Sequence, residues 1–289
     1  MRAVRIASVA LLTALTPLTG QDLKVFISVD MEGITGVVSS AEEASRAGKD
    51  YNYFRAVMTR EANAAIEGAL AAGATEIVVR DSHGSALNLL PEMLNSRARL
   101  LRGWSGGPLS MMEGIDASFD AVIFIGYHAK AGTPNGVIDH TSSGNVTDVS
   151  INGHSLPEAG YNALIAGYYD VPVVFAAGDQ ALCDQVQALL GPVETVATKQ
   201  GIGAAALNLH PEVAREHIRT GVERALRNLG DYEPYTLRPP YTLVLTMKTE
   251  QVVFEGAHYP GARRTGDWEL TYESTDIMDI MLAYNRMRR

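Results

Sequence analysis

The sequence has a single cysteine, Cys183, among its 289 residues. A lone cysteine cannot form a disulfide within the chain, so the fold must be stabilised by its core, by metal ions or by association of subunits. The surrounding segment, DQALCDQVQALL, has the apolar spacing of an amphipathic helix. We therefore expect a buried and unreactive thiol at this position.

The sequence also lacks any run of lysine and arginine, and its formal net charge is −9. Phosphate backbones bind to basic surfaces, so we expect no nucleic-acid partner. Internal repeats and low-complexity segments are absent as well, and 46% of the residues are hydrophobic. This length and composition fit one large or two modest globular domains with a substantial core.

Long apolar runs are missing except at the start of the chain. Residues 1–20, MRAVRIASVALLTALTPLTG, begin with Arg2 and Arg5, continue through an apolar stretch and end in small and turn-forming residues. This is the layout of a secretory signal peptide, and the apolar stretch is too short for a stable membrane anchor. We expect cleavage near Gly20, a periplasmic or secreted protein, and no stable membrane span afterwards.

Strand-like and helix-like segments alternate over the first two thirds of the sequence. Runs rich in β-branched and aromatic residues predict buried strands at 23–29, 75–80, 121–126 and 171–178. Three- and four-residue apolar spacing, glycine ends and proline starts predict helices at 51–72, 157–169 and 211–230. The alternation predicts an α/β fold with a largely parallel central sheet flanked by helices.

The final third has a different pattern. A proline-rich break, GDYEPYTLRPP, precedes an apolar strand, and VVFEGAHYPGARRTGDWELTYEST adds two strand-like runs before a helix near 275–288. We predict an α/β domain that carries a metal site over residues 21–195. A smaller α+β part is predicted over residues 196–289.

Ionisable side chains follow three of the predicted strands. Asp30 and Glu32 come directly after the first strand, His83 follows the second, and His128 follows the third. Ligands of open α/β sheets collect at the carboxyl ends of the strands, so we expect these residues to share one crevice. Histidine and carboxylate side chains are ligands of catalytic zinc, and this number of them suits a pair of metal ions.

A pair of cations also explains why two carboxylates lie at the edge of a predicted core. A buried carboxylate without a partner takes up a proton, whereas a bound dication keeps it ionised. Asp30 and Glu32 are two residues apart, so both side chains face one side if the chain stays extended. Gly33 then permits a sharp turn.

Two alternatives from other classes fit parts of the same pattern. Asp30-Met-Glu-Gly-Ile-Thr35 is similar to the DxDxT start of haloacid-dehalogenase-like phosphatases, in which Asp30 would be a nucleophile that works with Mg²⁺. That interpretation gives the strand-end histidines no role. A non-catalytic exported protein that binds peptide or metal is the other alternative. A serine hydrolase is disfavoured because the sequence has no G-x-S-x-G motif.

Several motifs in one order resemble the zinc-dependent D-aminopeptidases, a family of DppA-like metallopeptidases. The motifs are SVDMEGITG, DSHG, GYHAKAGTP, INGHSLPEAG and AGYYDVPV, and the resemblance extends over residues 23–288. It implies an aminopeptidase that holds two zinc ions per chain. The expected reaction is hydrolysis of short peptides with an N-terminal D-amino acid, of the D-Ala-D-Ala type, by metal-activated water.

The resemblance also assigns the metal ligands. Asp30 matches the carboxylate that bridges the two zinc ions. Glu32 and His128 match the other ligands of one ion, and His83 and Glu158 match the ligands of the second. Without the resemblance, Glu158 is an ordinary acid in the first turn of a predicted helix.

The remaining matches concern catalysis and assembly. His140, in the polar segment NGVIDHTSSG, matches the catalytic histidine of the family. We expect it to polarise the substrate or to transfer protons. The resemblance further implies a homo-oligomer, a ring-shaped decamer whose active sites face an enclosed chamber.

Overall fold

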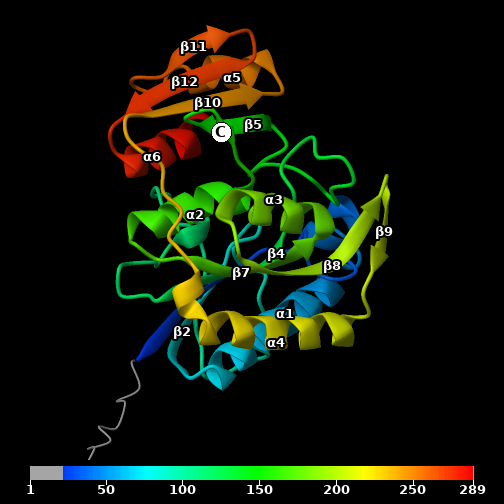
Figure 1. The fold of residues 1–289 in the computed structure, drawn as a ribbon. Helices are drawn as coiled ribbons and strands as arrows, with labels where there is room; N and C mark the ends of the chain where they lie inside the picture. Colours follow the sequence, from blue (N-terminus) through cyan, green and yellow to red (C-terminus); the bar gives the residue numbers. More distant parts are fainter. Residues whose placement is uncertain (1–21, 289) are drawn as a thin grey trace, which may run out of the picture.

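A seven-stranded sheet forms the centre of the computed structural model, which describes residues 22–288 (Figure 1). Its strand order is β3-β2-β1-β4-β7-β8-β9, and every neighbouring pair is parallel except β8 and β9. The strands are β1 (Leu23–Val29), β2 (Ala74–Asp81), β3 (Arg99–Leu101), β4 (Ala121–Tyr127), β7 (Val173–Asp179), β8 (Glu194–Ile202) and β9 (Ala205–Asn208).

Helices cover both faces of this sheet, which is why its central strands are apolar along their whole length. All seven residues of β4 and of β7 are buried. Figure 1 shows one pair of helices on each face. The first pair is α1 (Tyr51–Ala71) and α4 (Pro211–Arg227), and the second is α2 (Glu158–Tyr168) and α3 (Gln180–Leu190).

A second, five-stranded antiparallel sheet packs with helix α6 against the α2 side of the molecule. Its strand order is β11-β12-β10-β5-β6. The elements are β5 (Val146–Ile151), β6 (His154–Ser155), β10 (Tyr241–Met247), β11 (Arg263–Gly266), β12 (Glu269–Ser274), α5 (Glu250–Gly256) and α6 (Ile277–Met287). Three short helical turns occupy Ser40–Ala44, Ser110–Met112 and Leu229–Asp231.

The predicted α/β class, with a largely parallel central sheet, is confirmed. The four predicted strands correspond to β1, β2, β4 and β7, and the predicted helices to α1, α2, α4 and α6. One local difference lies in the stretch VVFEG. It belongs to helix α5, because a short apolar run has no period that separates a strand from a buried helix.

Each of the two sheets contains strands from both sides of residue 195. The central sheet continues past residue 195 through β8 and β9, and α4 packs against α1. Strands β5 and β6, from the middle of the chain, pair with β10 of the second sheet. The division into domains at residue 195 stays a prediction.

Two further expectations concern the ends and the cysteine. The predicted signal peptide, residues 1–20, lies outside the described residues. Within residues 22–288, no helix combines the length and the apolar character needed to cross a membrane. Cys183 is buried in α3, and burial raises the pKa of its thiol to about 12, as expected for an unreactive thiol.

Candidate metal centre

The carboxyl ends of three adjacent parallel strands bring the first site residues together. Strand β1 lies between β2 and β4, with Val29 opposite Asp81 on one side and Ile125 on the other. After β1 the chain passes to β2 on one side and only later to β4 on the other. A ligand-binding crevice is expected at such a switch point, and Asp30, His83 and His128 all lie there.

The first group of candidate ligands consists of Asp30, Glu32 and His83. Nδ1 of His83 lies 3.1 Å from Asp30 Oδ1 and 3.0 Å from Glu32 Oε2. Nε2 of His83 lies 2.8 Å from the carbonyl oxygen of Ala44, to which it can donate a proton. That hydrogen bond leaves the Nδ1 lone pair directed at the two carboxylates.

The second group is centred on His128 and Glu158. Nε2 of His128 lies 3.5 Å from Glu158 Oε1, and Nδ1 lies 2.9 Å from the carbonyl oxygen of Ala129. Glu158 Oε1 also accepts a hydrogen bond from the backbone N–H of Ser142 at 2.6 Å. Helix α2 begins at Glu158, so the helix dipole stabilises the negative charge of this carboxylate.

Asp30 lies between the two groups. Its Oδ1 is the atom that contacts His83, and its Oδ2 lies 3.7 Å from Nε2 of His128. One carboxylate therefore presents an oxygen to each group, as a bridging ligand must. The contacts pair the other ligands differently from what the resemblance implies: Glu32 lies with His83, and His128 lies with Glu158.

His140 reaches the second group from the loop before β5. Its ring stacks on His128, and its Nε2 lies 3.7 Å from Glu158 Oε1. Its Nδ1 lies 3.0 Å from the carbonyl oxygen of Ile138. The His140 side chain is 27% exposed, whereas that of His128 is fully buried. His140 is thus the histidine of this group that is open to the cavity.

The buried charges perturb one another strongly. Burial raises the pKa of Asp30 to about 8, and the negative charge of Glu32 adds to this effect. Burial alone would lower the pKa of His128, but the neighbouring Glu158 carboxylate raises it to about 10. Burial opposes the ionised form of Glu158 too, yet His128 holds its pKa at about 2. Such clusters of opposed, buried groups are typical of functional sites.

These side chains fit a pair of metal ions. Nε2 of His128 is buried and has no hydrogen-bond partner among the described residues, so it is an unused donor atom directed at carboxylates. Two ligands of a tetrahedral zinc ion lie about 3.4 Å apart, given zinc–ligand distances of about 2.1 Å. The separations in the two groups, 3.0 to 3.7 Å, match that spacing.

Close backbone packing fixes the segment that carries Asp30 and Glu32. Gly33 donates its N–H to the carbonyl oxygen of Gly126 at 2.7 Å, and a β-carbon on Gly33 would collide with the carbonyl of Tyr127. The glycine predicted to allow a turn is thus required for a close approach of two strand ends.

Buried Lys199, from β8, supports the same segment. Its ammonium group donates to the carbonyl oxygens of Glu32, Ile34 and Val37. Glu61, from α1, accepts the N–H of Thr35 at 3.0 Å. Neither residue is predictable from the sequence, because neither belongs to a motif and both come from elements outside the segment that they support.

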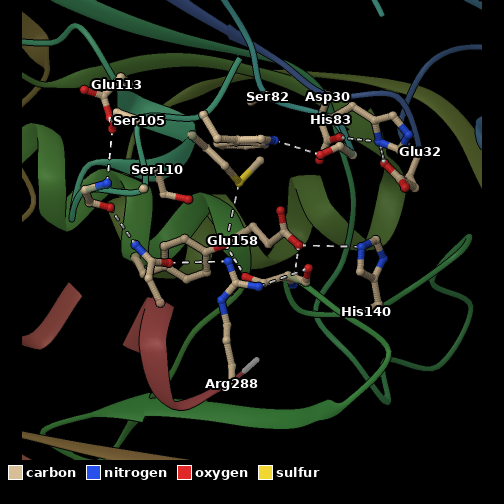
Figure 2. A pocket seen from close by; sticks show the side chains of 18 residues that line it. Asp30, Glu32, Ser82, His83, Ser105, Ser110, Glu113, His140, Glu158 and Arg288 are labelled. Atoms are coloured by element: carbon tan, nitrogen blue, oxygen red, sulfur yellow. Dashed lines mark hydrogen bonds and ion pairs between the residues drawn. The ribbon is translucent and has the colours of Figure 1, made fainter. Parts of the chain in front are cut away.

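A cavity of about 350 Å³ opens over the two groups (Figure 2). Figure 2 shows Asp30, Glu32 and His83 close together, with Glu158 and His140 facing them. The segment 104–113 and the C-terminal end of helix α6 form another part of the wall, through Trp104, Glu113, Asn285 and, just past the helix end, Arg288. Asn285 and Arg288 have no signal in the sequence, because α6 is brought to the site by packing on α2 together with the second sheet.

Known proteins match nearly the whole described chain. Residues 23–285 match the model of peptidase family M55, described as D-aminopeptidase. A D-aminopeptidase of Bacillus subtilis (strain 168) is 37% identical over 265 residues, which cover 90% of this chain and 95% of that protein.

A solved structure agrees with the sequence match. It is that of the zinc-dependent D-aminopeptidase DppA from Bacillus subtilis, described as a self-compartmentalizing protease. This chain is similar to it with a TM-score of 0.88 and 34% identity, over 92% of this chain and 96% of that one. The protein therefore belongs to the D-aminopeptidase family of metallopeptidases, as its sequence motifs predict.

Proposed function

We propose that this protein is a two-zinc aminopeptidase that removes an N-terminal D-amino acid from short peptides of the D-Ala-D-Ala type. The observation that carries the proposal is the position of Asp30, whose two carboxylate oxygens face two separate groups of buried ligands. Family membership argues against the phosphatase alternative, in which Asp30 would be a nucleophile and the histidines would have no role.

The contacts of Asp30 with both groups support two ligand sets that share this residue. Asp30, Glu32 and His83 would hold one ion, and Asp30, His128 and Glu158 the other. Zinc bound there would supply Lewis acidity, which polarises a peptide carbonyl and makes water acidic enough to attack it near neutral pH. The hydrogen bonds from His83 to Ala44 and from His128 to Ala129 fix the ring orientation of both histidines.

His140 is proposed to transfer protons and not to be a ligand. Its donor atom lies as close to Glu158 as a ligand would, but Asp30 already completes the second set. Because Nδ1 of His140 bonds to the carbonyl of Ile138, Nε2 is free to take up and release a proton at the cavity. From there it would protonate the leaving amine.

Assembly and export complete the proposal. The solved relative is described as self-compartmentalizing, which supports a homo-oligomer here, with a decamer as the form to test by light scattering. The family match begins at residue 23, after the segment with signal-peptide character. Export is tested by N-terminal sequencing of the protein recovered from the periplasm or the medium.

The activity is tested by release of free alanine from D-Ala-D-Ala and from L-Ala-L-Ala. The proposal predicts cleavage of the D-peptide, at a rate well above that of the L-peptide, and loss of cleavage with a chelator. Cleavage of the L-peptide alone would reject the D-specificity while leaving the metal site in place. Phosphate release with Mg²⁺ and no peptide cleavage would favour the phosphatase.

A further inference from the structure

The charged groups that line the cavity over the metal ligands are four carboxylates and one guanidinium, beside neutral residues and histidines. Among the described residues, Arg288 is the only lysine or arginine that lines it. Four carboxylates line the same cavity, and Asp30, Glu32 and Glu158 of these belong to the ligand groups. A single guanidinium in such a wall provides one defined place for an anionic group.

The guanidinium of Arg288 has few partners of its own. Nη1 lies 3.5 Å from the carbonyl oxygen of Ser142, and Nη2 lies 3.4 Å from Oδ1 of Asn285. Nε is buried without a hydrogen-bond partner, and no carboxylate of residues 22–288 forms an ion pair with the group. The plane of the group lies near the ring of Tyr284, with Cζ 5.2 Å from the ring centroid.

These contacts are too long and too few for a structural role alone. An arginine that connects a helix to a loop through a carboxylate makes hydrogen bonds of about 2.7–2.9 Å, which are often bidentate. Elsewhere in this fold, Arg224 makes such a pair with Glu194, at 2.8 and 2.9 Å. Arg288 instead lines the cavity with only long contacts at Nη1 and Nη2, and its Nε has no partner among the described residues.

The position of Arg288 places its donors beside the second ligand group. Ser142 accepts from Arg288 through its carbonyl and donates its N–H to Glu158, so one residue of backbone separates the guanidinium from a metal ligand. Figure 2 shows the side chain extending from α6 towards Glu158. An anion bound there would lie on the side of the cavity that carries Glu158.

We propose that Arg288 binds the terminal carboxylate of the peptide substrate and thereby selects short peptides with a free C-terminus. This inference rests on the proposed peptidase function. A short peptide carries opposite charges at its two ends, and the guanidinium attracts the carboxylate end while it repels the ammonium end. The peptide is then oriented with its leaving amino acid towards α6. Arginine suits this task because its planar fork matches a carboxylate with two parallel hydrogen bonds.

The test compares D-Ala-D-Ala with its C-terminal amide on the zinc-loaded protein. The ratio of kcat/KM for the acid to that for the amide is measured in the wild type and in Arg288→Met. The inference predicts a preference for the acid of about 10- to 100-fold in the wild type, from hydrogen bonds to a charged group, and its loss in the variant. Arg288→Lys keeps the charge but not the fork, and is expected to give an intermediate ratio.

Arg286→Met is the matched control. Arg286 is exposed on helix α6, two residues before Arg288, and does not line the cavity. Its Nη2 donates to the carbonyl oxygen of Gly106 in the cavity wall, so its loss removes the same charge and a wall contact but no donor that lines the cavity. The acid-to-amide ratio of this variant should equal that of the wild type. An unchanged ratio in Arg288→Met would overturn the inference and leave the peptidase function intact.

Calorimetric measurement of peptide binding tests the carboxylate site at Arg288 separately from the peptidase activity. If the wild type cleaves neither peptide, the proposed function is wrong, and binding of the two intact peptides is measured instead. Tighter binding of the acid that disappears in Arg288→Met would still support a carboxylate site. Equal binding of acid and amide, or no binding of either, would overturn it.

Discussion

The rings of His128 and His140 are stacked, with centroids 4.0 Å apart and an angle of 11° between their planes. Each ring has its Nδ1 at a backbone carbonyl, so each directs Nε2 towards Glu158, at 3.5 and 3.7 Å. Two histidines with nearly the same geometry are thus assigned different roles. Burial and the contact with Asp30 favour His128 as the ligand, and exposure to the cavity favours His140 as the proposed proton carrier.

Replacing His140 by Ala tests this division of roles. The variant should keep its full metal content and lose about 10²-fold or more in kcat, the size of a typical general acid–base contribution. Metal content is measured by elemental analysis and kcat by alanine release. Loss of one metal ion per chain would instead make His140 a ligand, and unchanged kcat would exclude the proton-transfer role.

Replacing Asp30 by Ala should remove metal and activity together. Both ligand groups lose an oxygen, because Asp30 Oδ1 faces His83 and Oδ2 faces His128. Asp184→Ala is the control, since Asp184 is on helix α3 and bonds only to Gln180 in the described residues. Two tightly held ions in the Asp30 variant would contradict the bridging assignment.

Lys199→Met should weaken zinc binding although Lys199 touches no ligand atom. Its ammonium group holds the carbonyls of Glu32, Ile34 and Val37. Loss of such support around a ligand typically lowers metal affinity by about 10- to 100-fold. Affinity is measured by competition with a chelator, and exposed Lys248→Met is the control. A folded Lys199 variant with wild-type affinity would show that the segment holds its shape without the lysine.

Glu61 should make stability depend on pH. Burial raises its pKa from 4.5 to about 7, against the hydrogen bond from the N–H of Thr35. The pKa of Glu61 is higher in the folded protein than in the unfolded chain. Its contribution to stability is therefore fully present below about pH 4.5 and is lost as the pH rises through about 7. Relative to Glu61→Gln, the wild type should therefore lose stability with rising pH, by an amount of order 3 kcal/mol.

Urea unfolding at several pH values between 5 and 8 measures this difference in free energy. Glu67→Gln is the control, because Glu67 is exposed on the same helix. Effects of pH on the metal ligands are common to all three proteins and cancel in the comparison. Parallel stability curves for the wild type and Glu61→Gln would contradict the shifted pKa.

The sequence predicted the strand-end residues because parallel strands of one sheet end at one edge. Asp30, His83 and His128 each follow a buried apolar run, and the structure places those runs side by side. Glu158 had no such signal, since it starts a helix; only the family resemblance pointed to it. The pairing of Glu32 with His83 depends on side-chain conformations, which spacing along the chain does not determine.

Contacts across elements distant in sequence were the hardest to predict. Arg288 reaches the cavity because α6 packs on α2 together with the second sheet. That sheet takes two strands from the middle of the chain, and strand pairing between distant segments is not visible in local patterns. Lys199 and Glu61 are buried charged residues, which sequence patterns place on the surface by default.

The most direct test of the account is a zinc titration of chelator-treated protein. Zinc is added in known amounts per chain while alanine release from D-Ala-D-Ala is followed, and bound zinc is determined by elemental analysis. A site bridged by Asp30 predicts two ions bound per chain, with full activity only when both are present. Cleavage that persists without metal, or a single ion at full activity, would contradict the two-metal site.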